Sequence, residues 1–215
     1  MKKLLALDTT SDFGSLALMD GPTLLEQVAL HSPGGFAHAL FQELEALLQR
    51  HNLKIADIDT FASASGPGSF TGVRIGLTAV KGLAEALGRE VVAVSNLEAL
   101  AWFGTRPLRA PIIDARRGEV YGAVYNSVGA KVCEEVVIKL PTWLDALPQG
   151  DLEIITQSFD VGATSWPIVT APRELAAAIG SIAAERVAQG QAQSPSAIDA
   201  NYVRRSDAEL FWKDT

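Results

Sequence analysis

Apolar residues occur along this chain in short runs and in longer periodic stretches, and the change between the two predicts its elements. Short apolar runs bounded by Gly, Pro, Asp or Asn are typical of strands. In the first half such runs occupy residues 4–7, 14–19, 24–30, 60–65 and 91–94. Tight turns join the first three, so we expect these strands to be antiparallel neighbours.

Two longer stretches of the first half have the period of a helix with a buried side. The first begins at Phe36, and its apolar face comprises Leu40, Leu44, Leu47 and Leu48, widened by Phe41. The second follows a glycine-rich turn and runs to Leu87, where Gly88 is the expected stop. A shorter helix is predicted over residues 96–103.

The second half repeats this order in a looser form. Strands are predicted at 111–114, 120–125 and 131–139, with weaker candidates at 152–155 and 168–169, and an alanine-rich helix at 173–189. This alternation indicates an α/β fold of two duplicated lobes with a mixed sheet in each. We expect the lobes to be residues 1–106 and 107–215.

Composition narrows the class of function. The 18 Lys+Arg and 25 Asp+Glu residues give a net charge of −7, which disfavours a chain that holds a phosphate backbone by itself. The single cysteine, Cys133, excludes an internal disulfide and fits a reducing compartment. The first apolar run ends at Asp8, short of the about 7–15 residues of a signal core. No run reaches the roughly 20 residues of a membrane span, so we expect a cytoplasmic protein.

The glycine-rich turn before the second long helix raises the question of phosphate binding, because the amides at a helix start favour anions. Its glycines, Gly66, Gly68 and Gly72, follow the spacing G-x-G-x-x-x-G. A dinucleotide fingerprint needs G-x-G-x-x-G, and a P-loop ends in Gly-Lys-Ser/Thr. Both patterns fail, which disfavours a phosphate cradle without excluding it.

Glycines inside the second helix support another interpretation. Gly72, Gly76 and Gly82 each cost about 1 kcal/mol relative to Ala, so we expect a neighbouring backbone to approach closely. Gly72 and Gly76 share one face, which can accept a helix of this chain or of another. An interface with a partner and a well-packed monomer core explain the pattern equally well. On the interface interpretation, Gly76→Leu disrupts pairing and leaves the monomer folded.

Two aspartates stand at equivalent places in the two halves. Asp8 ends the first strand and is followed by Thr9 and Thr10, and Asp114 ends the first strand of the second half. Paired aspartates in duplicated lobes can hold Mg²⁺ and phosphates. The same residue types also cap turns after strands, so both interpretations stay open.

Other reactive residues lack the context of a site. The histidines His31, His38 and His51 match no zinc spacing, so no metal site is expected. No serine lies in a G-x-S-x-G context, and we expect no catalytic residue. The charged segment 114–121 suits either a ligand site or a solvated hairpin.

Several segments that occur in order resemble the TsaB (YeaZ) family, the bacterial accessory proteins of tRNA threonylcarbamoyladenosine synthesis. These segments are Asp8-Thr9-Thr10, His31-Ser32, the run from Gly66 to Gly76, Ser95–Ala101, Asp114–Tyr121 and Tyr202-Val203-Arg204. The resemblance spans the chain and is thin between about residues 141 and 194. The chain departs from the family at Pro33-Gly34-Gly35, where an acidic residue is common.

The resemblance implies a duplicated fold of the type shared by actin, sugar kinases and heat-shock chaperone ATPases. It implies a non-catalytic scaffold that pairs with the transferase TsaD, which acts on the adenosine beside the anticodon of ANN-reading tRNAs. The ATPase TsaE joins this pair, so ATP or ADP with Mg²⁺ would belong to the assembled complex. The chain would meet tRNA only through the complex, form a homodimer when its partner is missing, and contact no membrane.

Carried over by position, the docking helices are about residues 36–49 and 70–87. The candidate partner-binding residues are Phe36, Leu40, Phe41, Leu44, Gly72, Val73, Gly76 and Val80, and the candidate nucleotide-binding residues are Asp8, Thr9, Thr10 and Asp114. The alternative function is a stand-alone ATPase or small-molecule kinase of the same superfold.

Overall fold

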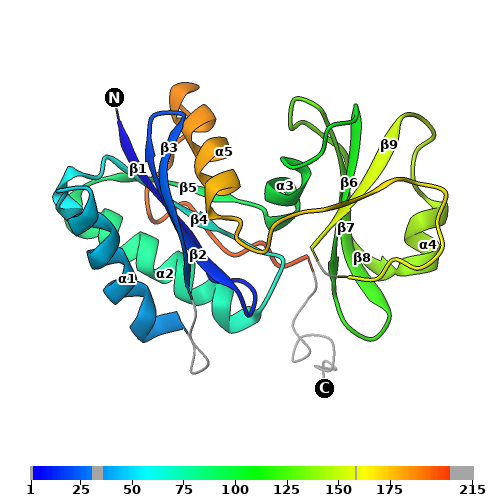
Figure 1. Cartoon of the computed structure of the whole chain (residues 1–215), viewed down its shortest axis with the longest axis horizontal. Helices are drawn as coiled ribbons and strands as arrows, with labels where there is room; N and C mark the ends of the chain where they lie inside the picture. The colour runs from blue at the N-terminus through cyan, green and yellow to red at the C-terminus, as the bar shows by residue number, and fades with distance from the viewer. Residues whose placement is uncertain (1, 31–35, 158, 204–215) are drawn as a thin grey trace, which may run out of the picture. The chain divides into compact units, whose positions relative to one another are not determined.

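The computed structural model describes residues 2–30, 36–157 and 159–203 of the chain (Figure 1). The described residues divide into two compact units. The first unit joins the residues up to Ala99 with Pro172–Ala200, and the second joins Leu100–Ala171 with the described residues after Ala200.

The first unit contains a five-stranded mixed sheet. Its strands are β1 (Lys3–Asp8), β2 (Gly14–Asp20), β3 (Thr23–Leu30), β4 (Thr60–Ala64) and β5 (Glu90–Val94), in the order β3-β2-β1-β4-β5. The first three strands pair antiparallel, which confirms the prediction from their short turns. β4 and β5 join β1 in parallel.

Helices cover both faces of this sheet (Figure 1). α1 (Phe36–Arg50) and α2 (Phe70–Leu87) lie on one face, and α5 (Ala176–Ala188) lies on the other. The 3₁₀ turn η1 (Ile55–Asp57) precedes β4, and α3 (Asn96–Ala101) follows β5 in the chain. Leu5 and Leu7 of β1 join the core under α1 and α2. Gly180 of α5 approaches Ala6 from the opposite face, because side chains alternate across a strand.

Local signals explain where α2 begins and ends. Ser69 caps its start, with the side-chain oxygen accepting a hydrogen bond from the Gly72 amide. Gly88 ends the helix in the left-handed conformation, at a φ of 62°, which glycine adopts without a steric cost. Gly88 stands where the sequence pattern predicts the helix to stop, and Ser69 stands just before Phe70, where the family resemblance implies that the helix starts.

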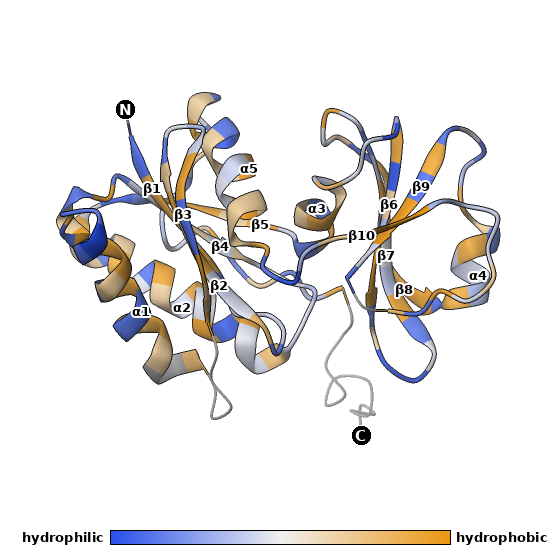
Figure 2. Ribbon diagram, viewed as in Figure 1, coloured by the Kyte–Doolittle hydropathy of each residue, from blue (hydrophilic) through white to orange (hydrophobic). Residues whose placement is uncertain are grey.

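The second unit repeats the sheet of the first. Its elements are β6 (Leu108–Asp114), β7 (Glu119–Asn126), β8 (Lys131–Lys139), α4 (Leu140–Asp145), β9 (Leu152–Thr156) and β10 (Ile168–Thr170). The order β8-β7-β6-β9-β10 matches β3-β2-β1-β4-β5 strand for strand. Figure 2 shows apolar and polar residues interspersed along the strands and helices of both units. The predicted duplicated α/β fold with a mixed sheet in each lobe is confirmed.

The position of α5 differs from the predicted lobe boundary after residue 106. α5 follows the second sheet in the chain but belongs to the first unit, where Arg186 binds the Ala93 carbonyl and the Glu98 carboxylate. The sequence pattern shows an apolar helix face and does not show which sheet that face covers. α4 and η1 lie outside the predicted elements.

Candidate functional site

The end of β1 brings together three of the four candidate nucleotide-binding residues. Asp8 is only 1% exposed. Its Oδ1 accepts hydrogen bonds from the Thr10 amide at 2.9 Å and the Thr10 hydroxyl at 2.6 Å. Burial raises the pKa of Asp8, and its hydrogen bonds with Thr10 and Asn96 offset part of that rise. One oxygen of the Asp8 carboxyl group is thus engaged with the turn that follows β1.

Asn96, the first residue of α3, joins this turn to the glycine-rich loop. Its Nδ2 donates to the Thr10 hydroxyl at 2.6 Å, and its Oδ1 accepts from the Gly66 amide at 2.9 Å. The Asn96 amide in turn donates to the Gly66 carbonyl at 2.9 Å. Asn96 is not among the predicted site residues, although an Asn at a predicted helix start is a recognised signal of a side chain that binds nearby backbone.

The glycine-rich segment packs directly on the end of β1. A Cβ atom on Gly72 would lie 1.9 Å from the Thr9 carbonyl oxygen, and one on Gly68 would lie 2.6 Å from the Thr10 carbonyl oxygen. At Gly76 it would meet the hydroxyl oxygens of Thr9 and Ser63 at 2.8 and 2.9 Å. The predicted close approach of a backbone is real, and the approaching backbone belongs to this chain. The face shared by Gly72 and Gly76 is thus occupied, and Gly76→Leu would disturb the fold of the monomer itself.

This packing also bears on the phosphate-cradle hypothesis. The Ser69 amide donates to the Thr10 carbonyl at 2.7 Å, and the Thr9 hydroxyl donates to the Gly72 carbonyl at 2.7 Å. The Gly72 amide binds the Ser69 side chain. A phosphate at this helix end would have to compete with the carbonyls and hydroxyls of the chain itself.

The structure shows how far each candidate partner-binding residue is covered by its own chain. Seven of the eight are buried within the first unit: Phe36, Leu40, Leu44, Gly72, Val73, Gly76 and Val80. Leu44 nevertheless lines the hollow described below. Phe41 differs, with half of its surface exposed. A helical period identifies an apolar face but does not tell which apolar residues are covered by the sheet of the same chain.

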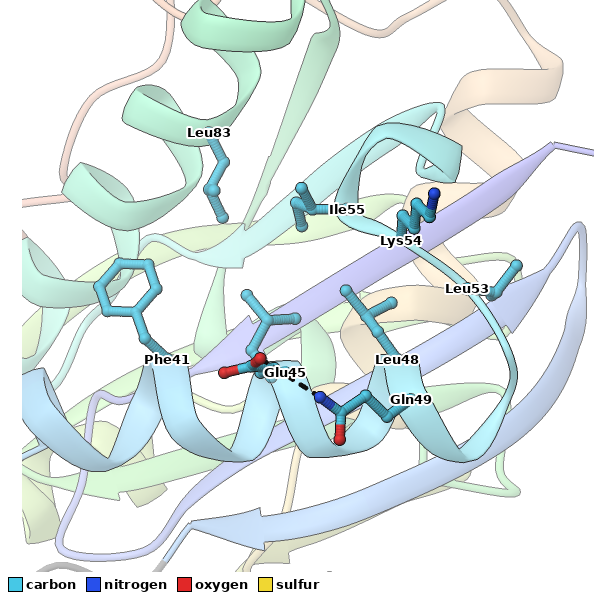
Figure 3. A pocket seen from close by; sticks show the side chains of 9 residues that line it. Phe41, Glu45, Leu48, Gln49, Leu53, Lys54, Ile55 and Leu83 are labelled. Carbon is cyan, nitrogen blue, oxygen red and sulfur yellow. Dashed lines mark hydrogen bonds between the residues drawn. The ribbon is translucent and has the colours of Figure 1, made fainter.

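A hollow opens beside Phe41, between α1, α2 and the turn that follows α1 (Figure 3). Its volume is about 440 Å³. We call it the α1–α2 groove; it is lined by Phe41, Leu44, Glu45, Leu48, Gln49, Leu53, Lys54, Ile55 and Leu83. Glu45 and Gln49 are joined by a hydrogen bond of 3.2 Å on its rim. Of these nine residues, sequence reasoning had proposed only Phe41 and Leu44 for contact with a partner.

The start of α2 carries a second exposed aromatic side chain. Phe70 is half exposed, and the guanidinium carbon of Arg74 lies 3.7 Å from the centre of its ring. Such a stacked pair is attracted through the ring quadrupole, which limits the freedom of both side chains. The amino-terminal end of α2 thus presents an ordered pair of large side chains to the surface.

Asp114, the fourth candidate nucleotide-binding residue, ends β6 in the second unit. β6 is the topological counterpart of β1, so the predicted equivalence of Asp8 and Asp114 is confirmed at the level of topology. Its surroundings differ, because Asp114 is solvent-exposed and accepts from the Arg116 amide at 2.7 Å. Arg116 and Arg117 then adopt left-handed backbone angles in a tight hairpin turn. The segment 114–121 is a hairpin, as one of its two interpretations predicted.

The remaining predictions concern histidines and the chain termini. His51 lies 2.8 Å from Glu26 through Nε2. Among the described residues no group of three metal-ligating side chains comes together, and no helix is long and apolar enough to span a bilayer. The predictions on the side chains of His31 and His38 and on residues 31–35 and 204–215 lie outside the described residues.

Comparison with known proteins places this arrangement in a family. The family model described as TsaD, tRNA N6-adenosine threonylcarbamoyltransferase, matches residues 35–195. The chain is 33% identical over 162 residues to the tRNA threonylcarbamoyladenosine biosynthesis protein TsaB of Bacillus subtilis, covering 73% of this chain and 71% of that protein. It is 33% identical over 175 residues to the TsaB of Escherichia coli, covering 77% and 74%. The chain belongs to the TsaB family.

Solved structures agree with this membership of the TsaB family. YeaZ from Pseudomonas aeruginosa superposes with a TM-score of 0.79 at 28% identity, over 94% of this chain and all of that one. A second structure from the same organism, described as similar to peptidase YeaZ, gives a TM-score of 0.81 over 95% of this chain. A threonylcarbamoyltransferase of Gluconobacter oxydans is 34% identical, but over only 46% of this chain and 31% of that protein. The TsaB relatives of Bacillus subtilis and Escherichia coli thus match 73% and 77% of the chain, more than this single transferase does.

Proposed function

We propose that this chain is a non-catalytic subunit of tRNA threonylcarbamoyladenosine biosynthesis that pairs with a TsaD-type transferase through α1 and α2. The observation that carries the proposal is the α1–α2 groove with the half-exposed Phe41 at its edge. We take the pathway from membership of the TsaB family. We take the kind of partner, a TsaD-type transferase, from the likeness of part of the chain to such transferases.

The chemistry of the groove supports a helical protein partner. Its floor is formed by leucine and isoleucine side chains, while Glu45, Gln49 and Lys54 stand among the lining residues with polar groups (Figure 3). An apolar strip with polar margins suits the apolar face of an amphipathic helix. Exposed aromatic side chains such as Phe41 contribute most to binding when a partner covers them completely.

The surroundings of Asp8 favour the non-catalytic function over the stand-alone ATPase or kinase. Asp8 is buried and bound to Thr10, and the glycine-rich loop is bound to Thr10 and Asn96. These groups would have to leave their partners before they could hold a nucleotide and Mg²⁺. We therefore assign the network a structural role.

Four further elements complete the proposal. A TsaE-type ATPase joins the pair, and ATP or ADP with Mg²⁺ is bound in that assembly. A second copy of this chain covers the α1–α2 groove when the transferase is missing. The net charge of −7 supports contact with tRNA only through the complex. We place the protein in the cytoplasm, where tRNA is modified.

The decisive experiment compares reconstituted complexes. The chain is mixed with TsaD-type and TsaE-type proteins of the same organism, pairing is measured by size-exclusion chromatography, and the modified nucleoside is measured with and without the chain. Phe41→Asp should abolish pairing while the monomer stays folded. Val128→Asp, at a position that is 84% exposed in the second unit, is the matched control and should pair normally.

Two outcomes would overturn the proposal. Pairing that Phe41→Asp leaves unchanged would move the docking surface away from the α1–α2 groove. Robust ATP turnover by the purified chain, abolished by Asp8→Ala, would replace the scaffold function with that of an ATPase or kinase.

A further inference from the structure

The connection between β4 and α2 is held by one buried side chain. Asn96 is 2% exposed and binds Gly66 twice, through its side-chain Oδ1 and through its own amide. Its Nδ2 reaches the Thr10 hydroxyl at 2.6 Å, across 86 residues of sequence. Asn96 therefore ties the start of the glycine-rich loop to the end of β1.

The direction of each hydrogen bond follows from the groups involved. The Thr10 hydroxyl has a single proton, which it donates to Asp8 Oδ1 at 2.6 Å. The hydroxyl oxygen must then accept from Asn96, which only the amide nitrogen can provide. The side chain at position 96 must therefore donate to Thr10 and accept from Gly66. An amide can do both, whereas a carboxylate has no proton to donate to Thr10.

The same turn of β1 holds the first turn of α2. The Thr10 carbonyl accepts from the Ser69 amide at 2.7 Å, and the Thr9 hydroxyl donates to the Gly72 carbonyl at 2.7 Å. Phe70, with Arg74 stacked on its ring, extends to the surface from this turn. Any shift of the network moves this exposed pair.

We infer that Asn96 is a positioning residue for partner docking: it fixes the amino-terminal end of α2 against the end of β1 and so sets the orientation of α2, whose Leu83 borders the α1–α2 groove. The inference rests on the proposed pairing through α1 and α2. At 2% exposure Asn96 cannot contact a partner itself, so it acts through α2. A fully satisfied buried polar network specifies one arrangement of its segments, whereas apolar packing tolerates several.

The test separates positioning from general stability. Asn96→Ala, Asn96→Asp and Thr10→Val each break the network, and Thr10→Ser keeps its hydroxyl. Ile179→Ala, in the buried face of α5 on the other side of the sheet, is the control for a general loss of stability. The affinity for the TsaD-type protein is measured at a temperature where every variant is fully folded, and hydrogen exchange is followed at the amides of Gly66 and Ser69.

We expect the three network variants to bind about tenfold more weakly or worse, and to exchange the Ser69 amide about tenfold faster before the partner is added. Asn96→Ala, which also removes the oxygen that accepts from Gly66, should exchange the Gly66 amide faster as well. Thr10→Ser and Ile179→Ala should stay within about twofold of the wild type in affinity. If one network variant does not fold, the other two decide the result.

Equal affinity of Asn96→Ala and the wild type would overturn the inference. An equal loss in Ile179→Ala would also overturn it, since stability alone would then explain the effect. If the wild type itself does not bind, the proposed function fails, and hydrogen exchange still decides whether Asn96 holds α2: unchanged exchange at Gly66 and Ser69 excludes that role.

Discussion

Gly72 and Gly82 occupy the same helix in opposite surroundings. A Cβ on Gly72 would lie 1.9 Å from the Thr9 carbonyl oxygen, whereas a Cβ on Gly82 would meet nothing within 4 Å. Two glycines with the same helix propensity therefore have opposite effects on the stability of the folded chain. One permits the approach of β1, and the other only lowers the stability of the helix.

Alanine substitutions should separate these two glycines. Gly72→Ala forces α2 away from β1 and should lower the free energy of unfolding by about 3 kcal/mol or more. Gly82→Ala should raise it by up to about 1 kcal/mol, because alanine has the higher helix propensity. Urea unfolding of both variants measures the difference, and similar losses in the two would contradict the structure.

Asp8 should make stability depend on pH in the direction opposite to a salt-bridged carboxylate. Burial raises the pKa of Asp8 above the ordinary value of an aspartate, so the folded chain holds this proton more tightly than the unfolded chain. Its contribution to stability is complete below about pH 4 and is lost as the pH rises through the folded pKa.

Asp8→Asn removes this titration and keeps an oxygen that accepts from Thr10. We expect the variant to be more stable than the wild type at neutral pH, with the difference shrinking toward pH 4. Urea unfolding between pH 4 and pH 7.5 tests the trend. A variant that is less stable at every pH would show that the ionised carboxylate is required.

At the scale of elements, α2 shows which features of a helix are determined by the residues at its own ends. Its cap residue Ser69 and its stop residue Gly88 are both visible in the sequence. The sequence does not show which side of α2 is buried, because both sides of the helix are apolar. Only the packed structure shows that Leu83 borders the α1–α2 groove.

The cap of α2 can be tested by itself. Ser69→Ala removes the oxygen that accepts from the Gly72 amide and should cost about 1 kcal/mol of stability. Ser69→Thr keeps the hydroxyl and should lower the stability by less than Ser69→Ala does. The two free energies come from chemical denaturation, and an Ala variant as stable as the Thr variant would rule out a capping role.

At the scale of the whole molecule, the first unit is discontinuous in sequence. α5 covers one face of its sheet and is anchored by Arg186, which binds Glu98 with two hydrogen bonds of 2.7 and 2.6 Å. Gly180 of α5 lies against Met19 of β2. The first sheet therefore depends on a helix that follows the second sheet in the chain.

This dependence predicts the behaviour of fragments. A fragment of residues 1–106 should fail to fold cooperatively, since one face of its sheet would be exposed to water. Linking residues 172–200 to that fragment should restore a cooperative thermal transition. Circular dichroism and amide proton dispersion distinguish the two, and a cooperatively folded 1–106 fragment would contradict the assignment of α5.

The sequence by itself determined the succession of strands and helices, the repeat of that succession in two halves, and the equivalence of Asp8 and Asp114. These features depend on periodicity and turn residues, which act over a few positions. The motif from Gly66 to Gly76 also sufficed to indicate the TsaB family.

Only the tertiary structure decided which groups meet across long stretches of chain. It placed the Thr9 backbone against Gly72, Asn96 against Thr10, and α5 on the first sheet. It also buried seven candidate docking residues and left Phe41 exposed. An amphipathic pattern shows that a face must be covered, but what covers it depends on how distant segments pack, and that choice is not local.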